Sequence, residues 1–223
     1  MPGLLKRLYR EEWQAWREHY RRYFTYAARA LGLGFVAGFL YFMIWPAREM
    51  KALAFVVRSF EDISLEASPL VLSLSLFSHN ARASMIAVAA GAAPFLFLPI
   101  LDPILNGGVL GLICSISKHQ GLNVPHLILT QVLPHSVFEL PAALYATSLG
   151  LYLSMGLGRA VVARRRRRKG LRAAEPLAPP GPLGFLESYP ERAAAGPGRL
   201  FRNVVRSFVL VVLPLLLVAA FVE

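Results

Sequence analysis

Cysteine and acidic residues are scarce in this 223-residue sequence, and each scarcity excludes a class of protein. Cys114 is the single cysteine, so an intrachain disulfide is excluded, and its apolar neighbours favour a core residue over a nucleophile. The chain has 13 acidic residues against 24 basic ones, a balance that would suggest nucleic-acid binding in a soluble protein. Here the basic residues flank apolar segments, as membrane topology signals do. We therefore expect no nucleic-acid partner.

Two further absences narrow the interpretation. Charged and aromatic residues recur through the first 24 positions, before any apolar run, so we expect no cleavable signal peptide. The zinc-site signature HExxH does not occur either. Apolar residues, by contrast, make up 56% of the chain, and the mean hydropathy is +0.49. This composition, gathered into long apolar runs, predicts an all-α, polytopic helical membrane protein.

The apolar runs predict about five transmembrane helices, plus an N-terminal amphipathic helix and a re-entrant or interfacial half-helix. Residues 124–133 are the half-helix, because they are too short to cross a bilayer of about 30 Å. Asp102 and Pro103 are expected to form a turn between the second and third spans. The predicted division is a cytoplasmic amphipathic helix at 1–25, a membrane domain at 26–158, a basic Pro/Gly-rich cytoplasmic loop at 159–199 and a fifth span at 200–223. Within the membrane domain we expect spans at 26–45, 83–101, 104–117 and 136–158, and a short interfacial helix within 46–69.

The distribution of charge predicts the orientation in the membrane. Residues 159–206 hold twelve basic and three acidic residues, whereas residues 46–69 hold three basic and four acidic ones. The positive-inside rule then places the N-terminus and the basic loop in the cytoplasm of a multi-pass protein of the plasma membrane. We expect the basic segments to contact anionic lipid headgroups. The strongest of these anchors is the run Arg164, Arg165, Arg166, Arg167, Arg168 and Lys169.

The stretch 131–150 is the most informative part of the sequence. His135 and Glu139 lie four residues apart and share one helical face, and ionisable groups are costly at membrane depth. Pro134 fits the first turn of a helix after a break, and Pro141 predicts a kink. Two interpretations stay open: a hydrogen bond that holds helices together, or a polar functional site inside the bundle.

Other polar and small residues extend this pattern. His79 and Asn80 belong to a polar patch before the second predicted span, and Asn106 precedes Gly107 and Gly108 at the start of the third. We treat His79, Asn80, Asn106, His135 and Glu139 as a candidate intramembrane polar site. The two glycines suit either an N-cap with close helix packing or backbone N–H groups open to a ligand. A GxxxG motif at 34–38 also predicts close helix contact.

Three segments together resemble the stage II sporulation protein M family of bacterial and archaeal membrane proteins: FSHN at 77–80, LNGGVLG at 105–111 and LPHSVFELPA at 133–142. The most specific part is Pro-His-x-x-x-Glu-x-Pro-Ala, with Ser136 where many members have glycine. The resemblance covers about residues 25–220 and carries family motif positions onto His79, Asn80, Asn106, Gly107, Pro134, His135, Glu139 and Pro141. It implies a multi-span membrane protein without a known enzymatic reaction. Members in endospore formers anchor peptidoglycan-remodelling enzymes, while many relatives occur in organisms that do not sporulate.

Three classes of function follow from these observations. The resemblance and the large basic cytoplasmic elements favour a non-enzymatic scaffold that recruits protein partners, a second copy of the chain among them. The polar residues at membrane depth favour a small-solute transporter or channel, with its site at His135 and Glu139. An intramembrane metalloenzyme would need three ligands: His135 with Glu139 supplies two, and recruiting His79 would complete the set. We expect no catalytic residue, no metal and no cofactor.

Overall fold

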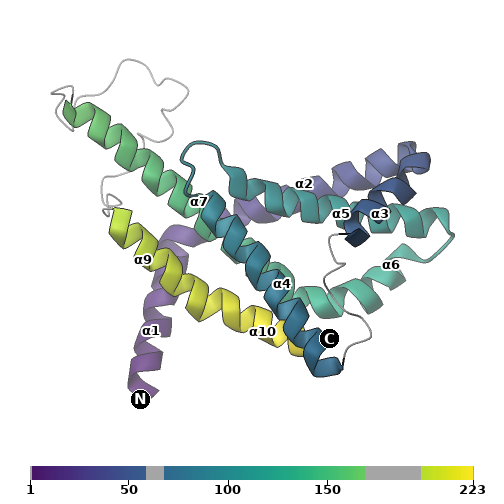
Figure 1. Cartoon of the computed structure of the whole chain (residues 1–223), viewed down its shortest axis with the longest axis horizontal. Coiled ribbons are helices and arrows are strands. Elements are labelled where there is room, and N and C mark those ends of the chain that lie inside the picture. Colours follow the sequence, from purple (N-terminus) through teal and green to yellow (C-terminus); the bar gives the residue numbers. More distant parts are fainter. Residues whose placement is uncertain (1, 59–67, 169–196, 223) are drawn as a thin grey trace.

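The computed structural model describes residues 2–58, 68–168 and 197–222, and every regular element in these ranges is helical. The longer helices are grouped around α7, the most deeply buried of them (Figure 1). In chain order they are α1 (Pro2–Ala15), α2 (Arg21–Ile44), α3 (Glu49–Arg58), α4 (Pro69–Ala90), α5 (Leu101–His119), α6 (Val124–Leu127), α7 (Leu133–Arg168), α9 (Pro197–Ser207) and α10 (Leu213–Val222).

Four helical stretches of the described residues are long and apolar enough to cross a membrane: Lys6–Ile44, Leu98–His119, Ser136–Arg165 and Pro197–Val222. The predicted all-α membrane fold is therefore confirmed. The helix α4 has 22 residues, which is about 33 Å at 1.5 Å per residue, but His79, Asn80 and Arg82 lower its apolar character. It is the remaining candidate for the fifth span.

The second predicted span, 83–101, is wrong. The helix α4 begins at Pro69 and ends at Ala90, so the polar patch at 78–82 lies inside a helix instead of before one. The chain then turns over Gly91–Phe97, and α5 begins at Leu101, which puts Asp102 and Pro103 in its first turn instead of in a loop. The turn is not evident in the hydropathy of residues 83–101, because Phe95, Leu96 and Phe97 are as hydrophobic as residues of a span.

The turn after α4 packs on small residues of α7. Gly91 contacts Gly150 so closely that a Cβ on either glycine would collide with the other helix's backbone or its adjoining turn. One turn of α7 further on, the Ser154 hydroxyl donates to the Ala93 carbonyl at 3.3 Å. A Cβ at Gly158 would lie 3.1 Å from the ring of Phe95, whose backbone is left-handed with φ 71°. Small residues four apart on α7 thus make the surface on which the turn lies.

The helices α2 and α5 lie side by side along their length (Figure 1). Their contact is made by glycines: a Cβ at Gly34 would collide with the Ile104 carbonyl, and one at Gly107 with the Leu31 carbonyl and the Phe35 nitrogen. Gly38 and Gly111 are equally crowded by backbone atoms of the facing helix. Because glycine has no side chain, the two backbones approach closely. Helices in a membrane associate in this way because lipid provides no hydrophobic driving force between them.

The chain stays helical through Pro134, where the sequence predicted a break. A π turn, Ile128–Val132, precedes α7, and the Leu133 N–H bonds the carbonyl five residues back. The register of the hydrogen bonds therefore shifts just before a residue that has no N–H to donate. The same arrangement recurs between α9 and α10: the π turn Phe208–Val212 ends with the Leu213 N–H on the Phe208 carbonyl, and Pro214 follows. Each π turn admits a proline without ending the helix.

The N-terminal amphipathic helix and the first span are joined by a third π turn, Trp16–Tyr20. Figure 1 shows α1 running at a steep angle to α2. At the other end of α2, the short helix predicted within 46–69 is α3, which covers Glu49–Arg58. Residues 59–67 and most of the predicted basic loop, 169–196, lie outside the described residues.

Candidate functional site

The residues predicted to form a polar site lie on three different helices. His79 and Asn80 are half-buried on α4, and Glu139 is half-buried on α7, which packs against α4. Asn106 is exposed on α5, and its amide donates to Asp102 of the same helix at 3.3 Å. His135 belongs to α7, and its side chain is outside the described residues. The structure thus brings α4 and α7 together and leaves Asn106 on a helix that packs chiefly on α2.

The other predicted positions are placed as follows. Gly107 is buried against α2, Gly108 is half-buried beside it, and Pro141 is inside α7. Arg164, Arg165 and Arg168 are exposed at the end of α7, while the side chains of Arg166 and Arg167 and all of Lys169 lie outside the described residues. Among the described residues, no three His, Cys, Asp or Glu side chains gather where they could hold a metal ion.

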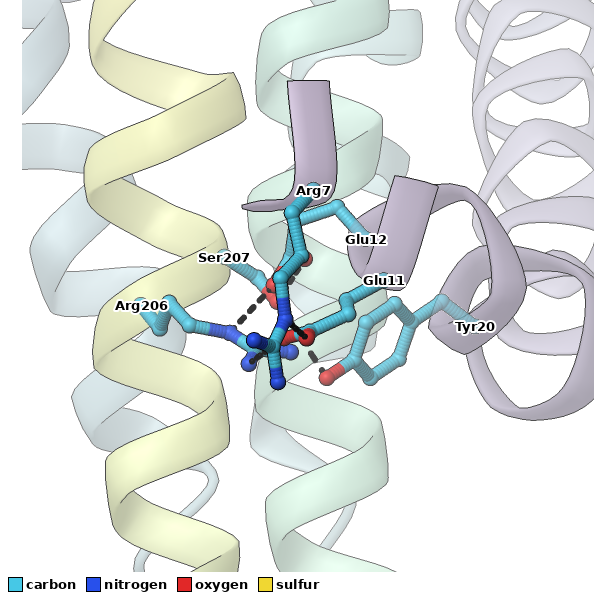
Figure 2. Close-up of polar contacts among 6 residues, drawn as sticks. All are labelled: Arg7, Glu11, Glu12, Tyr20, Arg206 and Ser207. Atoms are coloured by element: carbon cyan, nitrogen blue, oxygen red, sulfur yellow. Dashed lines mark hydrogen bonds and ion pairs between the residues drawn. The ribbon is translucent and has the colours of Figure 1, made fainter. Parts of the chain in front are cut away.

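A different set of polar residues forms a buried hydrogen-bonded cluster where α1 meets α9 (Figure 2). Glu12 is only 3% exposed although it belongs to an amphipathic helix. One carboxylate oxygen of Glu12 accepts from the Arg206 Nε at 2.5 Å, and the other accepts from the Ser207 hydroxyl at 2.6 Å. The Tyr20 hydroxyl lies 3.2 Å from the same serine oxygen. We call Glu12, Tyr20, Arg206 and Ser207 the α1–α9 cluster.

A second carboxylate continues the cluster toward the surface. Glu11 accepts from the Arg206 Nη1 at 3.2 Å with one oxygen and from the Arg7 Nε at 3.2 Å with the other. Arg206 therefore bridges two neighbouring carboxylates of α1 through a forked guanidinium, a geometry that lysine could not supply. Because both oxygens of Glu12 are bonded, its charge is compensated despite its burial. The arrangement fixes α1 on the bundle.

Aromatic rings around the cluster connect the same segment to α7. Trp16 stacks on Tyr145 with ring centroids 5.3 Å apart and meets Phe24 edge-on at 5.0 Å. Tyr20 makes edge contacts with Tyr145 at 5.9 Å and with Tyr152 at 5.1 Å. Offset and edge-to-face pairs add about 0.5–1.5 kcal/mol each beyond their burial. The bend between α1 and α2 is thus stabilised by aromatic contacts with α7 and by the ion pair of the α1–α9 cluster.

An apolar groove of about 540 Å³ adjoins the cluster. One wall is α1 and the π turn after it, with Tyr9, Trp13 and Trp16, and the opposite wall is the last span from Leu210 to Val218. Pro141 and Tyr145 of α7 form the floor, and Glu12 contributes the single charged group. The Tyr9 hydroxyl donates to the Leu210 carbonyl at 3.4 Å. The residue four positions after Leu210 is Pro214, which has no N–H to donate to that carbonyl.

A second buried carboxylate joins α3 to α5. Glu49 is 7% exposed, and the same oxygen accepts from the Ser115 hydroxyl at 2.7 Å and lies 2.9 Å from the His119 Nδ1. This contact anchors the segment after α2 on the end of α5. The group links two elements and is separate from the α1–α9 cluster.

Sequence reasoning missed both carboxylates, although one signal for Glu12 was available. Glu12, Trp16 and Tyr20 are spaced by four residues, so the glutamate shares a helical face with aromatic residues instead of with the charged ones. Its partners Arg206 and Ser207 are 194 and 195 residues further along the chain, and no local pattern identifies them. Glu49 gave no comparable signal.

These features define an all-α helical membrane protein whose N-terminal amphipathic helix is fixed to its last long helix. More particularly, the chain belongs to the stage II sporulation protein M family, whose sequence model matches residues 27–223. The resemblance in the three motifs is thereby confirmed. The match begins after α1, so Glu12, Tyr20 and the first wall of the groove precede it. Comparison with curated proteins finds no match, and neither does comparison with solved structures.

Proposed function

We propose that this chain is a non-enzymatic scaffold of the plasma membrane that recruits partner proteins for envelope or membrane remodelling. The observation that carries the proposal is the α1–α9 cluster, which holds a basic amphipathic helix in a fixed position on the bundle. A helix meant only to lie on lipid needs no buried ion pair to orient it. A helix that presents a surface to other proteins benefits from one, because a preorganised surface has less conformational freedom to lose on binding.

The surface offered in this way is charged and exposed. Gln14, Arg17 and Glu18 point away from the bundle, whereas Glu12 and Tyr20 of the same segment are buried in it. The exposed end of α7, with Arg164, Arg165 and Arg168, belongs to the same proposed cytoplasmic face. A partner with an acidic surface, or a second copy that pairs its own acidic and basic groups, would suit this face.

We expect the orientation to follow the charge distribution. In a Cys114→Ala background, a cysteine at Ala163 should react with a membrane-impermeant maleimide only after the cells are opened. A cysteine at Gln120, in the exposed turn after α5, should react in intact cells. Both replaced residues are exposed, so neither change should disturb the fold. Labelling of both positions from the same side would contradict the proposed topology.

The scaffold itself is tested by crosslinking in living cells. A photoreactive amino acid at Gln14 or Arg17 should yield a discrete protein adduct, because these exposed positions lie on the proposed recruiting surface. The control is the same group at Met50, which is 68% exposed on α3 at the opposite end of α2. Adducts of the same protein from all three positions would reflect non-specific proximity. Saturable solute flux in proteoliposomes, without an adduct at α1, would favour a transporter instead.

A further inference from the structure

We propose that the groove beside the α1–α9 cluster binds one acyl chain of an anionic phospholipid, with the phosphate held by basic residues of α1. The site lies between an amphipathic helix and a long apolar helix. This inference is independent of the scaffold proposal, since a bound lipid is compatible with either function.

The shape and lining of the groove indicate its occupant. Its volume of about 540 Å³ is within the range of about 300–1,000 Å³ that is usual for small-molecule sites. Apart from the Glu12 carboxylate, the hydroxyls of Tyr9 and Tyr145 and the two tryptophan indole N–H groups, the side chains that line it are apolar. The mouth is open: Trp13 is 61% exposed and Val218 is 45% exposed. Tryptophan at the mouth and aliphatic residues within match the passage from lipid headgroup to lipid tail.

The charge of Glu12 does not oppose an anionic ligand. Its oxygens are occupied by Arg206 and Ser207, and the arginine compensates the negative charge. Lys6 and Arg10 are exposed one turn apart on α1, the helix that forms one wall of the groove. Arg10 also lies three residues from Trp13, which makes the two side chains neighbours on the helix surface. A lipid phosphate beside Lys6 and Arg10 would be close to two cations, while the acyl chain of the same lipid enters the groove beside Trp13.

Tryptophan quenching provides the test. The chain has three tryptophans, so a Trp45→Phe background leaves Trp13 and Trp16, both of which line the groove. The purified full-length protein in detergent is titrated with phosphatidylglycerol brominated on its acyl chain. We expect saturable quenching. Val218→Phe should raise the half-quenching concentration about tenfold, because the ring displaces about two methylene groups of contact.

The matched control is Leu217→Phe, which adds a similar ring at the neighbouring position of α10, 43% exposed and outside the groove lining. This variant should bind the lipid as the background protein does. The double variant Lys6→Gln/Arg10→Gln tests the headgroup without touching the core. It should weaken binding of phosphatidylglycerol about thirtyfold, at about one kcal/mol for each of the two lost charges, and leave brominated phosphatidylcholine unaffected.

Equal quenching curves for Val218→Phe and Leu217→Phe would overturn the acyl site. Unchanged preference for phosphatidylglycerol in the double variant would overturn the headgroup assignment, even if Val218→Phe failed to fold. Non-saturable quenching in the background protein would also overturn the proposal, since it would reflect lipid of the general annulus. None of these results bears on whether Gln14 and Arg17 contact a protein partner, so the two proposals fail separately.

Discussion

Replacing Glu12 by alanine is expected to lower the free energy of unfolding by about 3 kcal/mol. Removing one partner of a buried pair costs about 3–5 kcal/mol, and the lower end applies because the Arg206 side chain is still 34% exposed. The change leaves the Arg206 guanidinium and the Ser207 hydroxyl without the acceptor they share. Denaturation in mixed micelles measures the loss. Limited proteolysis should at the same time become faster within α1, because the cluster fixes that helix on α9.

Two variants make this expectation specific to the buried pair. Glu18 is on the same segment, with a side chain 70% exposed, so Glu18→Ala should change stability by less than about 0.5 kcal/mol. Glu12→Leu combined with Arg206→Met removes both charges and should recover most of the loss, because apolar pairs often replace buried ion pairs at little cost. Equal effects of Glu12→Ala and Glu18→Ala would show that the cluster does not hold α1.

The sequence was sufficient for the fold class and for most helices, because apolar runs of span length admit few alternatives. It was insufficient where an apolar segment turns. Residues 91–97 include a glycine, a proline and three large apolar residues, and hydropathy alone does not separate such a turn from a span. The turn exists because Gly150, Ser154 and Gly158 of α7 offer a surface for it. That surface is a tertiary feature, some sixty residues away in the sequence.

The candidate site was harder to predict than the fold for the same reason. Polar residues at membrane depth point to the family motifs, but α5, which carries Asn106, packs chiefly on α2. It reaches α7 through Asp102, which accepts from the Thr147 hydroxyl at 3.4 Å. Glu12 and Glu49 each lie among other charged residues, where exposure is the ordinary outcome, so their burial is not predicted from the sequence. Their burial depends on partners contributed by α9 and α5. A carboxylate whose helical face carries aromatic residues is the pattern that would have singled out Glu12.

The glycine contact between α2 and α5 leads to the other large effect. Gly107→Ala is expected to destabilise the protein by about 3 kcal/mol or more, because overpacking costs about 1–3 kcal/mol even where flexible side chains can move aside. The obstacles here are the Leu31 carbonyl and the Phe35 nitrogen, which are backbone atoms, so all of α2 must shift to admit a methyl group.

The adjacent residue provides the control for this prediction. A Cβ at Gly108 would be 4.0 Å from its nearest neighbour, the Gly34 carbonyl, so Gly108→Ala adds a methyl group without a clash. Alanine also restricts the unfolded chain more than glycine does, and a gain of about 0.5–1 kcal/mol is expected. Gly32→Ala, with nothing within 4 Å of the new atom, should behave in the same way. Thermal denaturation of the three variants should therefore give one large loss and two small gains. Tolerance of alanine at Gly107 would mean that α2 and α5 are not in the close backbone contact described here.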